Sequence, residues 1–205
     1  NAKKLSFLLL ILVAVACTNR STSSEQDEMR HWNNVLQQIN ALLLENKARQ
    51  TLDLAKQTLP EILESAEKNG TTDTLIYYAR KIFNACGNNY INTKQYKDGI
   101  DYMDSIGNHP LIREHCPHEL LSFKAGLNQL YGNNPEAVRL AEDYLQLPVC
   151  TSANDFIRQA EIISGVYMYS GNNLPKAIQI LEKAIDVYRK GGNFPNMLRD
   201  RKSVV

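Results

Sequence analysis

The fold is decided by residues 83–99, whose sequence is FNACGNNYINTKQYKDG. Its apolar and small residues recur at intervals of three and four, as on one face of an α-helix: Phe83, Cys86, Gly87 and Tyr90. A second amphipathic segment follows, with Gly99 on its apolar face. A small residue lets two helices approach closely while larger neighbours fill the seam between them. The stretch therefore predicts a pair of packed helices.

The same helical spacing continues along almost the whole chain after Glu25. It predicts eight helices at residues 26–45, 47–68, 72–92, 95–107, 117–131, 135–147, 153–170 and 175–190. Three of them carry a proline in the first turn, where a missing N–H is harmless: Pro117, Pro135 and Pro175. No run of alternating apolar residues is long enough for a sheet. We expect an all-α chain of about four antiparallel helix pairs.

The four helix pairs share one internal spacing. The separation between an apolar residue of the first helix and a small residue of the second is identical in three pairs and one position longer in the last: Trp32 and Ala48, Phe83 and Gly99, Leu121 and Ala137, Ala160 and Ala177. This arrangement resembles the tetratricopeptide repeat over roughly residues 28–190. The resemblance implies an α-α superhelix, a solenoid of stacked pairs. An unrelated array of helix hairpins is the alternative.

In the tetratricopeptide family, the first helix of each pair lines a concave groove that holds a partner peptide. The resemblance places a polar stripe there, with these candidate residues: Asn33, Gln37, Asn84, Asn88, Asn92, Gln129 and Arg158. Amides donate and accept hydrogen bonds, so they suit a peptide backbone. The alternative is a solvated polar face. Arg30 and Arg158 lie far apart in the array, which disfavours a clamp for a terminal carboxylate.

Residues 109–118 contain the densest set of metal-binding residue types: His109, His115, Cys116 and His118. Imidazole and thiolate are zinc ligands, but this spacing matches no common structural zinc site. We therefore expect exposed loop histidines and a buried Cys116, with no metal and no cofactor. The chain also lacks a Gly-x-Ser-x-Gly motif and a phosphate-binding glycine loop, so we do not expect an enzyme.

The N-terminal segment, 1–16, combines Lys3 and Lys4 with an apolar run from Leu5 to Ala16, which is typical of a secretory signal peptide. The sequence Ala14-Val15-Ala16-Cys17 resembles a bacterial lipobox, in which the cysteine is acylated and becomes the new N-terminus. Residues 17–27 would then form a lipidated, flexible tether. We expect an extracytoplasmic protein held on a bacterial membrane. The alternative is an ordinary signal peptide in which Cys17 is incidental.

The sequence beyond the signal divides into a helical domain at residues 28–199 and a short end at 200–205. That end, DRKSVV, resembles a translated sequencing adapter, so we expect a non-native tail on a truncated gene. With 23 basic and 22 acidic residues, the chain has no global field that would recruit nucleic acid.

Together these features favour a membrane-anchored tetratricopeptide scaffold that binds a protein or peptide. The alternative is the N-terminal sensor of a larger signalling protein, with a histidine kinase or DNA-binding output. Arrays resembling this one stand at the front of such regulators in Bacteroidetes. An apolar run of about 20 residues after the repeats in the complete gene would favour the sensor.

Overall fold

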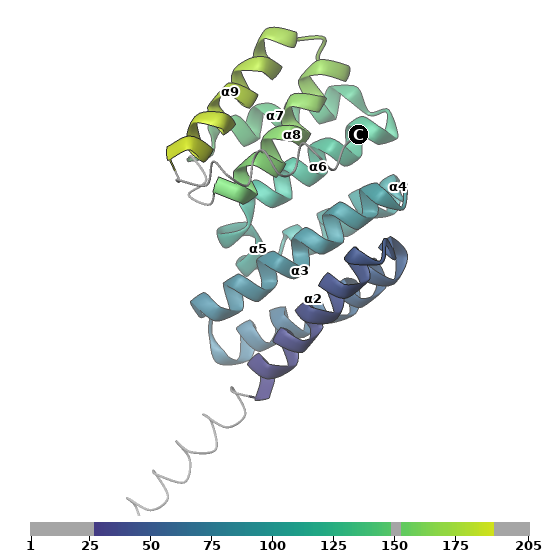
Figure 1. Ribbon diagram of the computed structural model, residues 1–205, viewed down its shortest axis with the longest axis vertical. Coiled ribbons are helices and arrows are strands. Elements are labelled where there is room, and N and C mark those ends of the chain that lie inside the picture. Colours follow the sequence, from purple (N-terminus) through teal and green to yellow (C-terminus); the bar gives the residue numbers. More distant parts are fainter. Residues whose placement is uncertain (1–26, 149–152, 191–205) are drawn as a thin grey trace, which may run out of the picture.

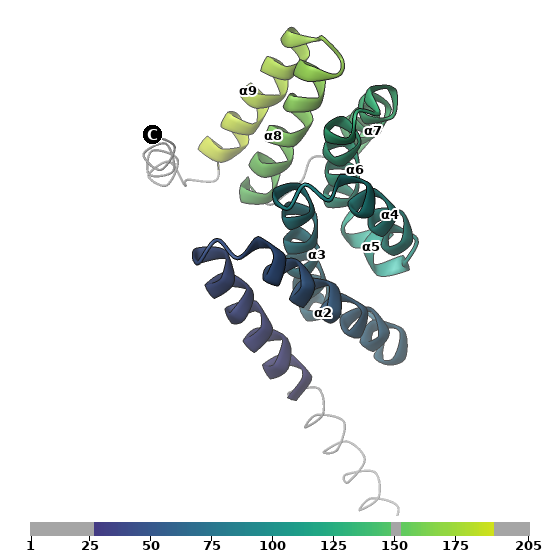
Figure 2. The same ribbon diagram turned by 90° about the vertical axis from the view of Figure 1, so that its right-hand side faces the viewer.

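The computed structural model describes residues 27–148 and 153–190, and every regular element in these ranges is an α-helix, as predicted (Figure 1). A helix at 27–44 precedes α2 (Ala48–Asn69), α3 (Asp73–Asn92), α4 (Tyr96–Gly107), α5 (Pro110–His115), α6 (Pro117–Tyr131), α7 (Asn134–Gln146), α8 (Ala153–Tyr169) and α9 (Leu174–Lys190). Consecutive helices pack in pairs that follow one another along the long axis (Figures 1 and 2). The predicted signal peptide, Cys17 and the tail lie outside the described residues.

The helix boundaries follow local signals in the sequence. The Thr72 side chain caps α3 by accepting a hydrogen bond from Leu75 N at 3.2 Å. Pro117 and Pro135 lie in the first turns of α6 and α7. Gly132 follows α6 with a φ of 94°, a left-handed conformation that glycine adopts without steric cost. These signals account for the agreement between predicted and observed helix ends.

One helix was not predicted. Helix α5 occupies what the sequence suggested was a turn. Pro110 supplies a preset φ at its start, and His109 Nδ1 accepts a hydrogen bond from Leu111 N at 3.2 Å. Leu111 and Ile112 are both buried. A helix this short cannot show a helical period, which is why the pattern was missed.

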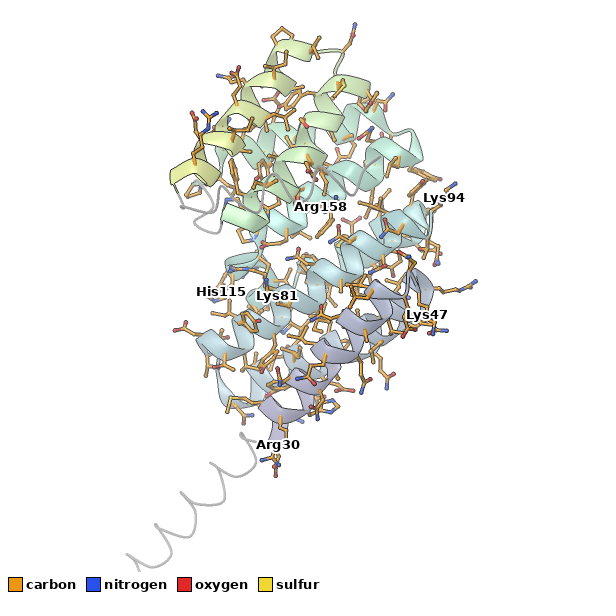
Figure 3. The ribbon with its side chains drawn as sticks, viewed as in Figure 1. Arg30, Lys47, Lys81, Lys94, His115 and Arg158 are labelled. Carbon is orange, nitrogen blue, oxygen red and sulfur yellow. The ribbon has the colours of Figure 1, made fainter. Side chains whose placement is uncertain are left out.

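The turns inside the four helix pairs share one feature, a residue with a positive φ at the same place in each turn. The residue two positions before each second helix has a positive φ, between 44° and 94°: Asn46, Lys94, Gly132 and Asn172. Besides glycine, asparagine tolerates this conformation, so the turn geometry overrides local preference only at Lys94. The matching turns are direct evidence that the pairs repeat. Lys47 and Lys94 accordingly lie at the same edge of the molecule (Figure 3).

The turns also fix the register of the repeat. The first intrahelical bond of each second helix runs from the small buried residue to the residue four before it: Thr51 to Lys47, Gly99 to Gln95, Ala137 to Asn133 and Ala177 to Asn173. Gly99 makes the expected close crossing, since a Cβ there would lie 3.0 Å from Cβ of Tyr90. The first pair, however, places Thr51 at this position in place of Ala48. The sequence alignment of that pair is therefore displaced, from Ala48 to Thr51.

A second set of glycines joins neighbouring pairs. Gly87, Gly126 and Gly165 are evenly spaced in the sequence, on α3, α6 and α8. A Cβ on Gly87 would lie 2.4 Å from the Phe123 ring, and one on Gly126 would lie 2.7 Å from Ile162. Each of these two glycines is thus covered by a bulky residue of the following pair. The packing role expected for Gly87 exists, but its partner helix is α6 and not α4.

The buried side chains form two clusters that meet at α6. The first extends from the 27–44 helix to α6, and the second from α6 to α9. An ion pair with a buried carboxylate lies at the junction, where Arg80 Nε is 3.2 Å from Glu119 Oε1. The Glu119 side chain is only 3% exposed. This contact joins α3 to α6, so it holds two successive pairs together.

Candidate functional site

The candidate site is a groove of about 550 Å³ between the 27–44 helix and α3, with one side chain from α8. We call it the amide groove. Its lining residues are Leu36, Ile39, Asn40, Leu43, Tyr77, Lys81, Asn84, Ala85, Asn88, Asn89, Asn92 and Arg158. Figure 3 shows Lys81 and Arg158 near the middle of the molecule, where the second and fourth pairs face each other.

The two walls of the amide groove differ in chemistry. The 27–44 helix supplies an apolar wall from Leu36, Ile39 and Leu43, whereas α3 supplies amides at every fourth residue from Asn84 to Asn92. Residues four apart share one face of a helix, so these amides form a row. No aspartate or glutamate of the described residues lines the groove. The arrangement offers both apolar contact and hydrogen bonds that do not require a charged partner.

The three asparagines of this row are not equivalent. Asn88 Nδ2 donates to Asn84 O at 2.9 Å, and Asn88 Oδ1 accepts from Arg158 Nε at 3.0 Å. The Asn88 amide is therefore engaged at both ends, and it positions Arg158. The side chains of Asn84 and Asn92 form no hydrogen bond with any described residue. These two amides are the ones that remain available to a ligand.

Lys81 is a groove residue that sequence reasoning missed. It lies about one helical turn before Asn84 and two before Asn88, which places it on the same stripe of α3. That spacing could have identified it. Its Nζ lies 5.8 Å from the centre of the Tyr77 ring, a cation–π distance. The groove therefore contains two cations, Lys81 and Arg158, which were not expected to be neighbours.

Three predicted groove residues do not line the amide groove. Asn33 and Gln37 are exposed on the 27–44 helix, beside a face formed by Leu36, Asn40 and Leu43. The alignment of the first pair is displaced by three residues, so the face that lines the groove moves from Asn33 and Gln37 to Leu36 and Asn40.

The third of these residues, Gln129, is half-buried at the junction of α6 and α8. Its Oε1 lies 3.7 Å from the position of a Cβ on Gly165. Helix α8 packs on α6, and it covers the face that was predicted to be open.

Asn89 lies at the base of the amide groove and is fully buried. Its Nδ2 donates to Ala85 O at 2.8 Å, but no described residue donates to its Oδ1. Buried acceptors without a donor are uncommon and cost roughly 1–3 kcal/mol. The base of the groove thus contains an amide oxygen that a hydrogen-bond donor would stabilise.

A smaller hollow of about 200 Å³ adjoins the groove between α3 and α8, and we call it the inner pocket. Its lining residues are Lys81, Asn84, Asn88, Phe123, Arg158, Gln159 and Ile162. Four of them also line the amide groove, so the two hollows share their polar residues. Phe123 and Ile162 give the inner pocket an apolar base.

The histidine-rich stretch at 109–118 has separate structural tasks. His109 Nε2 lies 3.1 Å from Glu67, while His118 Nε2 donates to Pro148 O at 2.6 Å. Cys116 is buried, as predicted. The expectation of exposed loop histidines was wrong, because all three histidines are partly buried, and His115 and His118 lie within α5 and α6. Across residues 27–148 and 153–190, no three histidine, cysteine or acidic side chains gather in a way that could hold a metal ion.

Cys86 is the other thiol of interest in the described chain. Its Sγ lies 3.8 Å from Tyr102 Oη, inside the core. Burial raises the pKa of the Cys86 thiol to about 12. A thiol of this kind stays protonated at neutral pH and is a poor nucleophile. Cys86 therefore belongs to the packing of α3 against α4.

Comparisons with known proteins identify no relative: no protein-family model, no curated protein and no solved structure matches the chain. Among the described helices, none combines the length and hydropathy needed to cross a membrane. The geometry of the amide groove is therefore the main guide to function.

Proposed function

We propose that this chain is a tetratricopeptide-like scaffold, without catalytic activity, that holds a protein or peptide segment in the amide groove. The repeated turns and the close crossing of Gly99 with Tyr90 support the tetratricopeptide assignment. The main support for the proposed binding function is the groove itself, which has one apolar wall and one row of amides. A volume of about 550 Å³ lies within the usual range of ligand sites.

The row of amides suits an extended polypeptide. Residues four apart on a helix are separated by about 6 Å along its axis. Side groups on one face of an extended chain repeat at a similar distance, about 7 Å. Asn84 and Asn92 can therefore contact backbone groups of a peptide that runs along α3, while its apolar side chains contact Leu36 and Leu43. From Tyr77 to Asn92 the groove is roughly 22 Å long, enough for about seven extended residues.

Leu43→Glu is expected to weaken peptide binding by about tenfold, because it places a charge on the apolar wall. The probe is a displayed library of random peptides selected on the purified chain, and the measurement is the affinity of the selected peptides. Leu44 is 86% exposed and does not line the groove, so Leu44→Glu is the matched control. Equal affinities for the two variants, or a library that yields no binder, would refute the binding function.

We also propose that the chain is exported and anchored to a bacterial membrane through Cys17. The support is the apolar run up to Ala16 and the lipobox-like Ala14-Val15-Ala16-Cys17. In a bacterial host fed radiolabelled palmitate, the wild-type chain is expected to carry the label and to sediment with membranes. Cys17→Ser should abolish both, whereas Cys150→Ser should change neither. Equal labelling of the two variants would rule out acylation at Cys17.

A further inference from the structure

The inner pocket has the size of a subsite. Its volume of about 200 Å³ is below the range of a complete small-molecule site but suits one large side chain. Phe123 is 1% exposed and forms the base with Ile162, so the deepest part of the pocket is apolar. The opening lies beside Asn84 and Asn88, which also line the amide groove. A peptide in the groove would therefore pass the opening of this pocket.

Two cations flank that opening. Lys81 and Arg158 line both hollows, and no acidic residue of the described chain lines either one. Arg158 Nη1 lies 3.3 Å from Glu161, which offsets part of its charge, and its Nε is held by Asn88. Lys81 has no carboxylate partner among the described residues. The opening thus keeps a net positive charge that favours an anionic group.

The cations lie along the groove and not at its end. Tyr77 lines the groove one turn before Lys81, while Asn88 and Asn92 line it two and three turns after Lys81. A bound chain that contacts all of these residues continues past the cations on both sides. The group that reaches Lys81 and Arg158 is then a side-chain carboxylate inside the segment. A carboxylate at the end of the chain would leave part of the groove unused.

We propose that the inner pocket takes a large apolar side chain of the bound peptide, and that Lys81 and Arg158 bind an acidic residue beside it. This inference rests on the proposed peptide-binding function and gives it a sequence preference. The expected ligand segment therefore pairs an aspartate or glutamate with a neighbouring leucine, phenylalanine or similar residue. Charge-assisted hydrogen bonds and apolar burial would then act at adjoining positions.

The test uses a library of random peptides displayed with both ends fused, so that no peptide has a free terminal carboxylate. Peptides selected on the wild-type chain are expected to be enriched in an acidic residue next to a large apolar one. The double variant Lys81→Gln and Arg158→Gln should lose the acidic preference and bind the wild-type peptides about tenfold more weakly. Lys94→Gln, at an exposed turn outside the groove, is the charge control.

A second variant tests the pocket itself. Asn84→Phe is expected to fill the opening and to remove the preference for a large apolar residue while the acidic preference remains. Thermal unfolding of each variant checks that the fold is retained. Selected peptides without the paired preference, or with a preference unchanged in both variants, would overturn the inference and leave groove binding intact. Binding that requires a free terminal carboxylate would also overturn it.

Discussion

Replacing Gly87 with leucine is expected to lower the free energy of unfolding by about 3 kcal/mol or more, a large share of the roughly 5–15 kcal/mol by which a domain is ordinarily stable. Even a Cβ at this position would lie 2.4 Å from the ring of Phe123, which is buried and would have to shift. Gly87→Ala should therefore already destabilise the chain, although alanine favours a helix by about 1 kcal/mol over glycine. Urea titration followed by circular dichroism measures both effects.

Gly165 provides the matched control, because it occupies the equivalent place on α8, two helix pairs further along the chain. The nearest atom to a Cβ there is Gln129 Oε1 at 3.7 Å, an ordinary contact. Gly165→Ala is expected to stabilise the chain by roughly 0.5–1 kcal/mol through helix propensity alone. If the alanine variants at 87 and 165 change stability in the same direction, the packing assigned to Gly87 is incorrect.

Arg80→Met is expected to cost about 3–5 kcal/mol of stability, since it leaves a carboxylate buried without its cation. Glu119 is 3% exposed and its Oε1 lies 3.2 Å from Arg80 Nε. Arg80 also donates from Nη2 to His115 O at 2.5 Å, so one substitution releases contacts to both α5 and α6. The free energy of unfolding in urea at neutral pH is the measurement.

Two further variants distinguish the cost of burying an unpaired carboxylate from the cost of losing the Arg80 side chain. Arg80→Met combined with Glu119→Leu should recover much of the lost stability, because no charge is then buried. The exposed pair Lys97 and Asp101, 3.0 Å apart, is the surface control, and Lys97→Met should change stability by less than about 1 kcal/mol. A double variant no more stable than Arg80→Met would show that the ion pair is not the cause.

Much of the fold could be predicted from the sequence because the signals that specify helices are local. Periodicity located every described helix except α5, and Gly99 identified the crossing point with Tyr90. The register of the first pair could not be predicted, because Ala48 and Thr51 are both small and lie about one turn apart on α2. The observed turn at Asn46 decided between them, and that choice required backbone conformation.

Less of the candidate site could be predicted from the sequence, because the site depends on contacts between residues that are distant in the chain. Asn84, Asn88 and Asn92 share a helix face, so sequence periodicity found them together. The bond between Asn88 and Arg158 joins residues 70 positions apart, and periodicity gives no distance between different helices. For the same reason, the spacing could place Gln129 on a polar stripe but could not show that α8 covers it.

The residue that packs on each of the glycines Gly87 and Gly126 comes later in the sequence, and this order affects how the chain folds during synthesis. Gly87 is covered by Phe123, and Gly126 by Ile162, so each covering residue is made one helix pair later than its glycine. A newly synthesised helix pair therefore leaves the surface around its glycine exposed until the next pair leaves the ribosome. At ordinary rates of about 5–20 residues per second, that interval lasts roughly 2–7 seconds. A pause within α6, before Phe123 emerges, would prolong the exposure of the α3 surface.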